Sequence, residues 1–328
     1  MNKIYLEKLK AGDSVRFITP AQSFKIISPE CRQIAEDRFQ KLGLKISFGK
    51  HVEECDDFTS SSIKSRIEDL HDAFADKNIK AIFTIIGGFN SNQLLDYIDW
   101  DLIKNNPKIF CGYSDITALN NAIYAKTGLI TYSGPHYSTL GQKLHFDYTL
   151  DYFKKCLFSS DPFDIVASKQ WSDDRWYADQ NDRHLIDNDG YWPINSGEAK
   201  GTIIGGNLCT LNILQGTQYM PPLTDSILFI EDDATSKHHD FDRNLQSLIH
   251  LPEFKSVKGI VIGRFQKASE VSRHILEQII HTKKELNHLP VVGNVDFGHT
   301  DPKICFPIGG EASLSISPKS IKINIINH

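Results

Sequence analysis

Residues 81–86 read Ala-Ile-Phe-Thr-Ile-Ile and stop at Gly87-Gly88. An uncharged, β-branched run of this length is typical of a strand that is buried on both faces of a sheet. Apolar residues at helical spacing occur before it, in residues 63–74, and again in residues 116–123, after a second strand-like run at 108–111. Strands that alternate with helices predict an α/β fold, in which helices cover both faces of a parallel sheet.

The second half of the chain resumes the alternation after an interruption. Strand-like runs occur at 201–206, 227–230, 259–263 and 291–292, helical patterns at about 241–250 and 270–286, and a β-hairpin pattern at 312–326. Residues 161–193 instead place tryptophans and tyrosines among Asp, Asn and Arg, which indicates a long loop with exposed aromatic side chains. We therefore predict an N-terminal domain over 1–165, a linker loop over 166–195 and a C-terminal domain over 196–328.

Composition narrows the class of protein. The net charge of -5 is modest and neither sign is gathered into a tail, so a nucleic acid polymer is not the expected partner. The six cysteines are scattered without a C-x-x-C pair, which predicts reduced thiols. The N-terminus lacks the features of a secretory signal, and no apolar run approaches the roughly 20 residues of a membrane-spanning helix. These features predict a cytoplasmic protein without a membrane partner.

The segment 108–116 reads KIFCGYSDI, an apolar strand that runs into Ser114 and at once into a helix. A serine on such a turn projects from the sheet edge, and the helix N-terminus behind it offers free N–H groups and a partial positive charge. Both favour the oxyanion that forms when a carbonyl is attacked. The arrangement resembles a nucleophile elbow, although the segment does not continue from Asp115 to the second glycine of the G-x-S-x-G pattern. Taken alone, Ser114 is more typical of a helix N-cap than of a nucleophile.

Gly87-Gly88 forms a second turn at the carboxyl end of a strand, and parallel sheets place both turns at the edge where α/β proteins bind ligands. Paired glycines let the backbone approach a substrate closely. We therefore assign an oxyanion hole to the backbone N–H groups of Gly88 and Asp115, with Gly87 as a substrate contact. A plain turn is the alternative, and a dinucleotide site is disfavoured because G-x-G-x-x-G is absent.

A hydroxyl nucleophile needs a base, and the base needs an orienting group. His299 is the best placed of the 13 histidines, because it follows an apolar strand in the segment NVDFGHTD and precedes Pro302. Glu231 ends the apolar strand 227–230 and is the candidate orienting acid. A carboxylate at the solvent edge is the alternative for Glu231.

A metal site is the competing interpretation of residues 231–240, which are rich in Asp, Glu and His. The adjacent residues His238 and His239 point in different directions on a helix, unlike the i, i+4 pair of H-E-x-x-H. An acidic helix start accounts for most of the run, so we expect no metal ligands here.

Five motifs, in chain order over about residues 85–310, together resemble the LD-carboxypeptidase family of serine peptidases: IIGGFNSNQLL, CGYSDITAL, GGNLCTLNILQGTQYMP, ILFIEDD and GNVDFGHTDPKICFPIG. The resemblance implies a Ser-His-Glu triad, in which Ser114 attacks, His299 is the base and Glu231 orients the histidine. It also implies an N-terminal Rossmann-like domain, a C-terminal α/β domain with a β-rich, barrel-like core, a homodimer, and no metal or other cofactor.

Two activities occur in the family that the chain resembles. One is cleavage of the amide between an L- and a D-residue of murein tetrapeptides in cell-wall recycling. The other is cleavage of the bond that joins a peptide or amino acid to a nucleotide-like sulfamoyl or phosphoramidate group. The GTQYMP segment and the tryptophan-rich residues 171–192 resemble the second, microcin C self-immunity branch.

In that branch, aromatic side chains stack on the base, which implies this role for Trp171, Trp176 or Trp192. Simple packing of a long loop is the alternative. The expected function is hydrolysis of peptidyl- or aminoacyl-nucleotides. A murein tetrapeptide carboxypeptidase, a catalytically idle binding protein and a metal-dependent hydrolase remain as alternatives.

Overall fold

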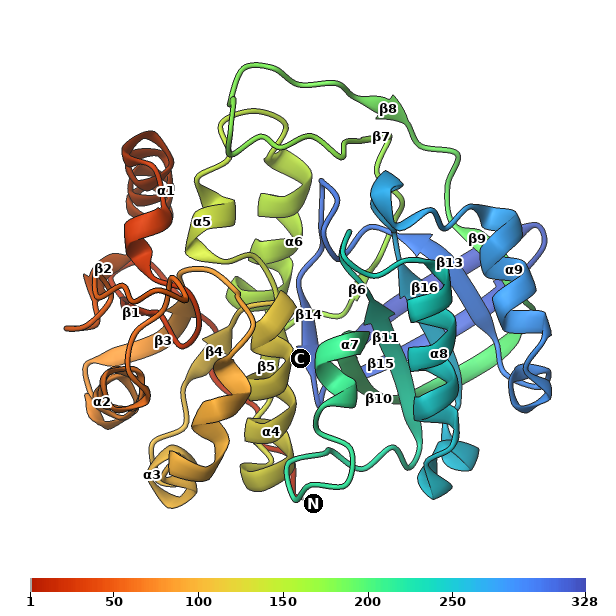
Figure 1. The fold of residues 1–328 in the computed structure, drawn as a ribbon, viewed down its shortest axis with the longest axis horizontal. Helices are drawn as coiled ribbons and strands as arrows, with labels where there is room; N and C mark the ends of the chain where they lie inside the picture. The colour runs from red at the N-terminus through yellow and green to blue at the C-terminus, as the bar shows by residue number, and fades with distance from the viewer. Residues whose placement is uncertain (1) are drawn as a thin grey trace.

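The computed structural model describes residues 2–328, which form two large β-sheets flanked by helices and a small two-stranded ribbon (Figure 1). The first sheet belongs mainly to the N-terminal half and the second to the C-terminal half. The segment that carries the ribbon strands β7 (Gln170–Trp171) and β8 (Ile186–Asp187) crosses above both halves in this view. The predicted α/β fold class is confirmed.

The first sheet has the strand order β14-β5-β4-β3-β1-β2. Its strands are β1 (Ser14–Ile18), β2 (Lys45–Phe48), β3 (Ile79–Thr84), β4 (Ile109–Cys111), β5 (Thr131–Ser133) and β14 (Phe306–Ile308). The strands from β5 to β2 are parallel, whereas β14 pairs antiparallel with β5. The carboxyl ends of β3 and β4 therefore meet at one edge, which places the turns after them side by side.

The helices of the first half begin and end at the signals that the sequence contains. They are α1 (Pro29–Lys41), α2 (Ile63–Ala75), α3 (Trp100–Asn105), α4 (Thr117–Thr127), α5 (Tyr137–Leu140) and α6 (Asp147–Phe158). The hydroxyls of Ser28 and Ser62 accept hydrogen bonds from the first turns of α1 and α2, as N-caps do. Gly128 ends α4 at a φ of +79°, a left-handed conformation that favours glycine.

The second sheet has the order β6-β16-β15-β10-β11-β12-β13-β9, which confirms a β-rich core. Its strands are β6 (Phe163–Asp164), β9 (Trp192–Asn195), β10 (Gly197–Asn207), β11 (Ser226–Glu231), β12 (Gly259–Gly263), β13 (Val291–Val295), β15 (Glu311–Ser317) and β16 (Ser320–Asn327). The central strands β10 to β13 are parallel and the outer ones antiparallel. Every residue of β11 and β12 is buried, as expected for central parallel strands.

Two details differ from expectation. The helix expected over 270–286 is shorter, because Glu270 has a positive φ and Ser272 caps α9 (Arg273–His281). Residues 161–193 contribute strands at both ends of the second sheet, and Trp171, Trp176 and Trp192 are half-buried rather than exposed. Trp192 lies on β9, which pairs with β13, so this tryptophan belongs to the sheet.

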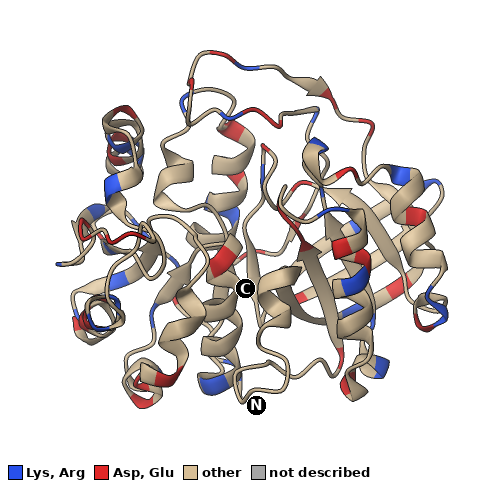
Figure 2. Cartoon of the chain, in the orientation of Figure 1, with Lys and Arg blue, Asp and Glu red and all other residues tan. Residues whose placement is uncertain are grey.

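Acidic and basic residues are interspersed over both halves of the molecule (Figure 2). The helices α7 (Leu208–Asn212), α8 (His238–Ile249) and α9 cover the second sheet. No helix in the described part of the chain is long and apolar enough to cross a bilayer. All six cysteines are free thiols, as predicted.

Candidate active site

Ser114 occupies a strained turn between β4 and α4. It opens a short 3₁₀ helix (Ser114–Ile116) with a φ of +60°, a left-handed conformation that is uncommon for residues other than glycine. The N-cap position of α4 is Ile116, without a side-chain hydrogen bond. The N-cap interpretation of Ser114 is therefore wrong, and its hydroxyl is directed elsewhere.

Ser114 lies in a hydrogen-bonded line with a histidine and a glutamate. Its Oγ is 3.0 Å from Nε2 of His299, and Nδ1 of His299 is 2.8 Å from Oε2 of Glu231. Glu231 is the last residue of β11 and is 3% exposed, whereas His299 lies in the loop that follows β13. The structure thus brings together the three residues that the sequence proposed as a triad.

The surroundings of His299 make its imidazole more basic. Burial by itself would lower the pKa of His299, but the charge and the hydrogen bond of the Glu231 carboxylate outweigh burial and leave this pKa raised. A carboxylate can only accept, so Nδ1 carries a proton and the lone pair of Nε2 faces the Ser114 hydroxyl. This arrangement can take a proton from the serine.

Gly298 leaves room for the carboxylate of Glu231 beside His299. Its φ is +101°, and a Cβ built on it would lie 2.7 Å from Oε2 of Glu231. A side chain at this position would displace the carboxylate that holds the imidazole.

The two halves are joined by buried hydrogen bonds beside the nucleophile. Nδ2 of Asn121, on α4, donates to the carbonyl of Gly205 at 2.8 Å, and the N–H of Gly205 donates back to Oδ1 of Asn121 at 3.4 Å. The N–H of Asn207 donates to Oγ1 of Thr117 at 2.9 Å. Asn207 pairs with Glu231 in the sheet, so these bonds hold the helix behind Ser114 against the strands that carry the acid.

The Gly87-Gly88 turn lies directly against Ser114. A Cβ on Gly87 would lie 3.1 Å from Cβ and 3.3 Å from Oγ of Ser114, and Gly88 has a φ of +156° with Gln22 and Ala21 close by. The backbone N–H groups of Gly88 and Asp115 have no hydrogen-bond acceptor within residues 2–328. Both are thus free to bind a substrate oxygen.

His136 and Lys303 are buried beside the Tyr113 ring, which also contacts His299. The ring of Tyr113 lies 4.4 Å from His136 and 5.4 Å from His299 between centroids, and Nζ of Lys303 lies 5.6 Å from that ring. Lys303 forms an ion pair with Asp301. Burial, and then the charges of His299 and Lys303, lower the pKa of His136 to about 3, so His136 is neutral. No sequence motif singled out His136 or Lys303, although Lys303 lies in the last family-like segment.

The acidic stretch after Glu231 is divided between the interior and the surface. Burial and then the charge of Glu231 raise the pKa of Asp232 to about 7. His239 pairs with Asp240 at the surface. Across residues 2–328, no group of three or more His, Cys, Asp or Glu side chains is arranged to hold a metal ion.

The three candidate tryptophans occupy different surroundings. Trp171 and Trp192 line a cavity of about 530 Å³, where the guanidinium of Arg264 lies 5.2 Å from the Trp171 ring. The described residues that line this cavity include none of the triad. Trp176 packs against the hydrophobic core and lies edge-on to Tyr177 at 5.9 Å. The structure thus separates Trp176 from Trp171 and Trp192, which share a cavity that Ser114 does not line.

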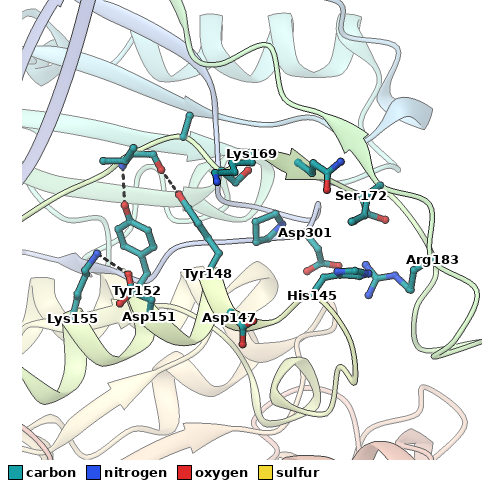
Figure 3. A pocket seen from close by; sticks show the side chains of 16 residues that line it. His145, Asp147, Tyr148, Asp151, Tyr152, Lys155, Lys169, Ser172, Arg183 and Asp301 are labelled. Atoms are coloured by element: carbon teal, nitrogen blue, oxygen red, sulfur yellow. Dashed lines mark hydrogen bonds and ion pairs between the residues drawn. The ribbon is translucent and has the colours of Figure 1, made fainter.

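A second cavity, of about 510 Å³, lies between α6, the 166–172 segment and Asp301. In Figure 3, Tyr148 and Tyr152 rise from α6 toward that segment, and Arg183 points toward His145. Asp301 follows His299 by two positions, so this cavity borders the loop that carries His299.

The chain is similar to known proteins over nearly its whole length. Residues 15–134 match the LD-carboxypeptidase N-terminal domain, and residues 200–314 match the LD-carboxypeptidase C-terminal domain. A protein of Bacillus subtilis (strain 168), provisionally named carboxypeptidase YocD, is 54% identical over 99% of this chain and 100% of its own length. The microcin C7 self-immunity protein MccF of Escherichia coli is 32% identical over 96% of this chain and 94% of its own length.

Solved structures show the same fold. The crystal structure of an MccF-like protein from Bacillus anthracis str. Ames has a TM-score of 0.97 and 53% identity, with 98% of each chain covered. A structure of MccF in complex with glutamyl sulfamoyl guanosine has a TM-score of 0.88 and 29% identity, again with 98% of each chain covered.

Proposed function

The chain belongs to the LD-carboxypeptidase family, and from this premise we propose that it is a serine peptidase that hydrolyses the amide-like bond of aminoacyl- or peptidyl-nucleotides. The observation that carries the proposal is the line from Ser114 through His299 to Glu231, with contacts of 3.0 and 2.8 Å. Such a line on a strained strand-to-helix turn is the arrangement that activates a serine hydroxyl.

The proposed reaction begins when Oγ of Ser114 attacks the carbonyl carbon next to the scissile nitrogen. Nε2 of His299 takes the serine proton, and Glu231 stabilises the imidazolium that forms. The N–H groups of Gly88 and Asp115 bind the oxyanion of the tetrahedral intermediate.

His299 then gives its proton to the departing nitrogen, and the acyl group stays on Ser114. A water molecule, deprotonated by His299, attacks this ester and releases the carboxylic acid and the free serine. Every proton taken by His299 is returned, so the residues described suffice for a full cycle.

The nucleotide part of the proposal is supported by the relatives. MccF is named a microcin C7 self-immunity protein, and its solved complex contains glutamyl sulfamoyl guanosine. A planar base can stack on an aromatic side chain, at about 1–3 kcal/mol per contact. Trp171, Trp176 and Trp192 are the candidate partners, and we place the base-stacking role among them.

Cleavage of murein tetrapeptides is the second candidate, because the matching family descriptions name an LD-carboxypeptidase. A murein stem peptide has no flat ring to stack on a tryptophan. The two substrates therefore make different demands on the aromatic segment.

The test compares an aminoacyl sulfamoyl adenosine with an LD-tetrapeptide on the same enzyme preparation. We expect efficient hydrolysis of the adenosine conjugate, and at least a tenfold rise in its KM in one of the variants Trp171→Ala, Trp176→Ala or Trp192→Ala. Tyr177→Ala, which removes an exposed neighbouring ring, is the matched control. Efficient cleavage of the tetrapeptide alone would refute the nucleotide assignment, and hydrolysis of neither would favour an idle binding protein.

A further inference from the structure

The side chain of Asp115, directly after the nucleophile, points back to the Gly87-Gly88 turn. Its Oδ2 accepts a hydrogen bond from the backbone N–H of Ser91 at 2.9 Å, and Oγ of Ser91 donates to the backbone carbonyl of Asp115 at 2.8 Å. Asp115 is 4% exposed and Ser91 is fully buried. Two residues 24 positions apart thus exchange two buried hydrogen bonds.

The segment between Gly87 and Ser91 has few other attachments. The N–H of Gln22 donates to the carbonyl of Gly87 at 3.1 Å, and the buried guanidinium of Arg66 donates to the carbonyl of Asn90 at 3.0 Å. Both attachments run to other parts of the first half and neither runs to the nucleophile turn. The pair of Asp115 and Ser91 is therefore the direct hydrogen-bonded link between the two turns.

The link spans the two halves of the proposed oxyanion hole. One free N–H belongs to Gly88, on the Gly87–Ser91 side, and the other belongs to Asp115 itself. Two donors stabilise one oxyanion only when each lies about 2.7–3.1 Å from the same oxygen. The spacing between these donors depends on how firmly the two turns are held together.

We infer that the Asp115 carboxylate is a positioning residue that fixes the spacing of the oxyanion-hole donors through its hydrogen bond to Ser91. This inference rests on the proposed function, because it assigns a task to the same site. It gives the side chain of Asp115 a role separate from that of its backbone N–H.

The test uses Asp115→Ala, Asp115→Asn and Ser91→Ala, with Ser226→Ala as the control. Ser226 is fully buried in the second sheet, and its Oγ donates to a backbone carbonyl at 2.7 Å, so the control removes a similar bond far from the site. Steady-state hydrolysis gives kcat and KM, and the rate of labelling by a fluorophosphonate reports formation of the tetrahedral adduct. Thermal unfolding of each variant checks the fold.

We expect Asp115→Ala to lower kcat and the labelling rate about 10- to 100-fold, because loss of one oxyanion donor costs about 10²–10³ in kcat and here the donor is displaced rather than removed. Ground-state affinity, measured for Ser114→Ala with and without Asp115→Ala, should stay within about threefold. Asp115→Asn should recover most of the rate, since its amide oxygen can accept from Ser91. Ser91→Ala should show a smaller loss, and Ser226→Ala none.

Three results would overturn the inference: an unchanged labelling rate in a folded Asp115→Ala protein, equal inactivity of Asp115→Asn and Asp115→Ala, or a loss confined to KM. If Asp115→Ala does not fold, Asp115→Ser decides, because its side chain is too short to accept from the backbone N–H of Ser91, and wild-type rates in a folded Asp115→Ser protein would reject the link. Ser91→Ala tests only the second bond, since it keeps that backbone N–H. Failure of the proposed function itself is distinguishable, because wild-type protein would then resist the probe or Ser114→Ala would remain active.

Discussion

Asn121→Leu should weaken both the fold and the reaction, because Asn121 joins α4 to the second sheet. The replacement keeps the volume of the side chain but removes its donor and its acceptor. It leaves the carbonyl and the N–H of Gly205 without the partners that they have at 2.8 and 3.4 Å. Both groups are buried, so water cannot replace the amide without a rearrangement.

The expected loss of stability follows from these two groups of Gly205. An unsatisfied buried polar group costs about 1–3 kcal/mol, and the longer bond counts for less, so the free energy of unfolding should fall by about 2–3 kcal/mol. An unfolding entropy of about 2.1 cal/mol/K per residue gives about 0.7 kcal/mol/K for a chain of 328 residues, so this loss corresponds to a Tm lower by about 3–4 °C. Because α4 follows the short 3₁₀ helix that begins at Ser114, the distance from Ser114 to His299 should also become less well defined, and kcat should fall about tenfold or more.

The assay pairs thermal unfolding with steady-state kinetics on the proposed substrate. Asn212→Leu is the matched control, since Nδ2 of Asn212 donates at 2.8 Å to the carbonyl of Asn244 within the second half. This control should lose stability and keep its kcat. An unchanged kcat in an Asn121→Leu protein that is less stable would refute the idea that this contact positions the serine.

Other predictions concern the titratable groups. Glu231→Gln should lower kcat by about 10⁴ while the affinity of the Ser114→Ala form for substrate changes little, as direct binding would show. The kcat/KM of the wild type should rise with pH through an apparent pKa above 6.5, because Glu231 raises the pKa of His299 and the base must be neutral; a flat pH profile would contradict this. In Glu231→Gln, the midpoint should move to lower pH. Finally, His136 is neutral in the folded protein, because its pKa is lowered to about 3. The unfolded state therefore binds one more proton below about pH 6.5, and the free energy of unfolding should fall as the pH is lowered. Denaturant unfolding at several pH values should show that this free energy depends less steeply on pH in His136→Gln than in the wild type.

The elements that the sequence predicted best are those with local signals. Ser28, Ser62 and Gly128 each mark a helix end, and residues 81–84 of β3 and all of β11 and β12 are buried as expected. The triad is different, since His299 follows Ser114 by 185 positions and no spacing predicts that contact. The prediction that Ser114 and His299 act together came from the motifs that resemble those of the family.

The contacts that the sequence could not predict are those between elements without a motif. The amide of Asn121, the neutral imidazole of His136 and the carboxylate of Asp115 look ordinary along the chain, and only their burial shows what they bind. The tryptophan segment was wrongly expected to be exposed, because β9 has too few residues to show the alternation of a strand. Pairing of β14 with β5 likewise depends on three residues. The domain limits, the homodimer and the cytoplasmic location stay predictions.

The most direct test of the central claim is the reactivity of Ser114. Intact-mass analysis after treatment with a fluorophosphonate should show one adduct on the wild-type protein, mapped to Ser114, and none on Ser114→Ala. The same variant should keep its fold and lose hydrolysis almost entirely, because loss of a triad member costs about 10⁴-fold or more. Two results would contradict the assignment of Ser114 as the nucleophile. One is a wild-type protein that the probe does not label, and the other is a Ser114→Ala protein that retains more than about 5% of the wild-type hydrolysis rate.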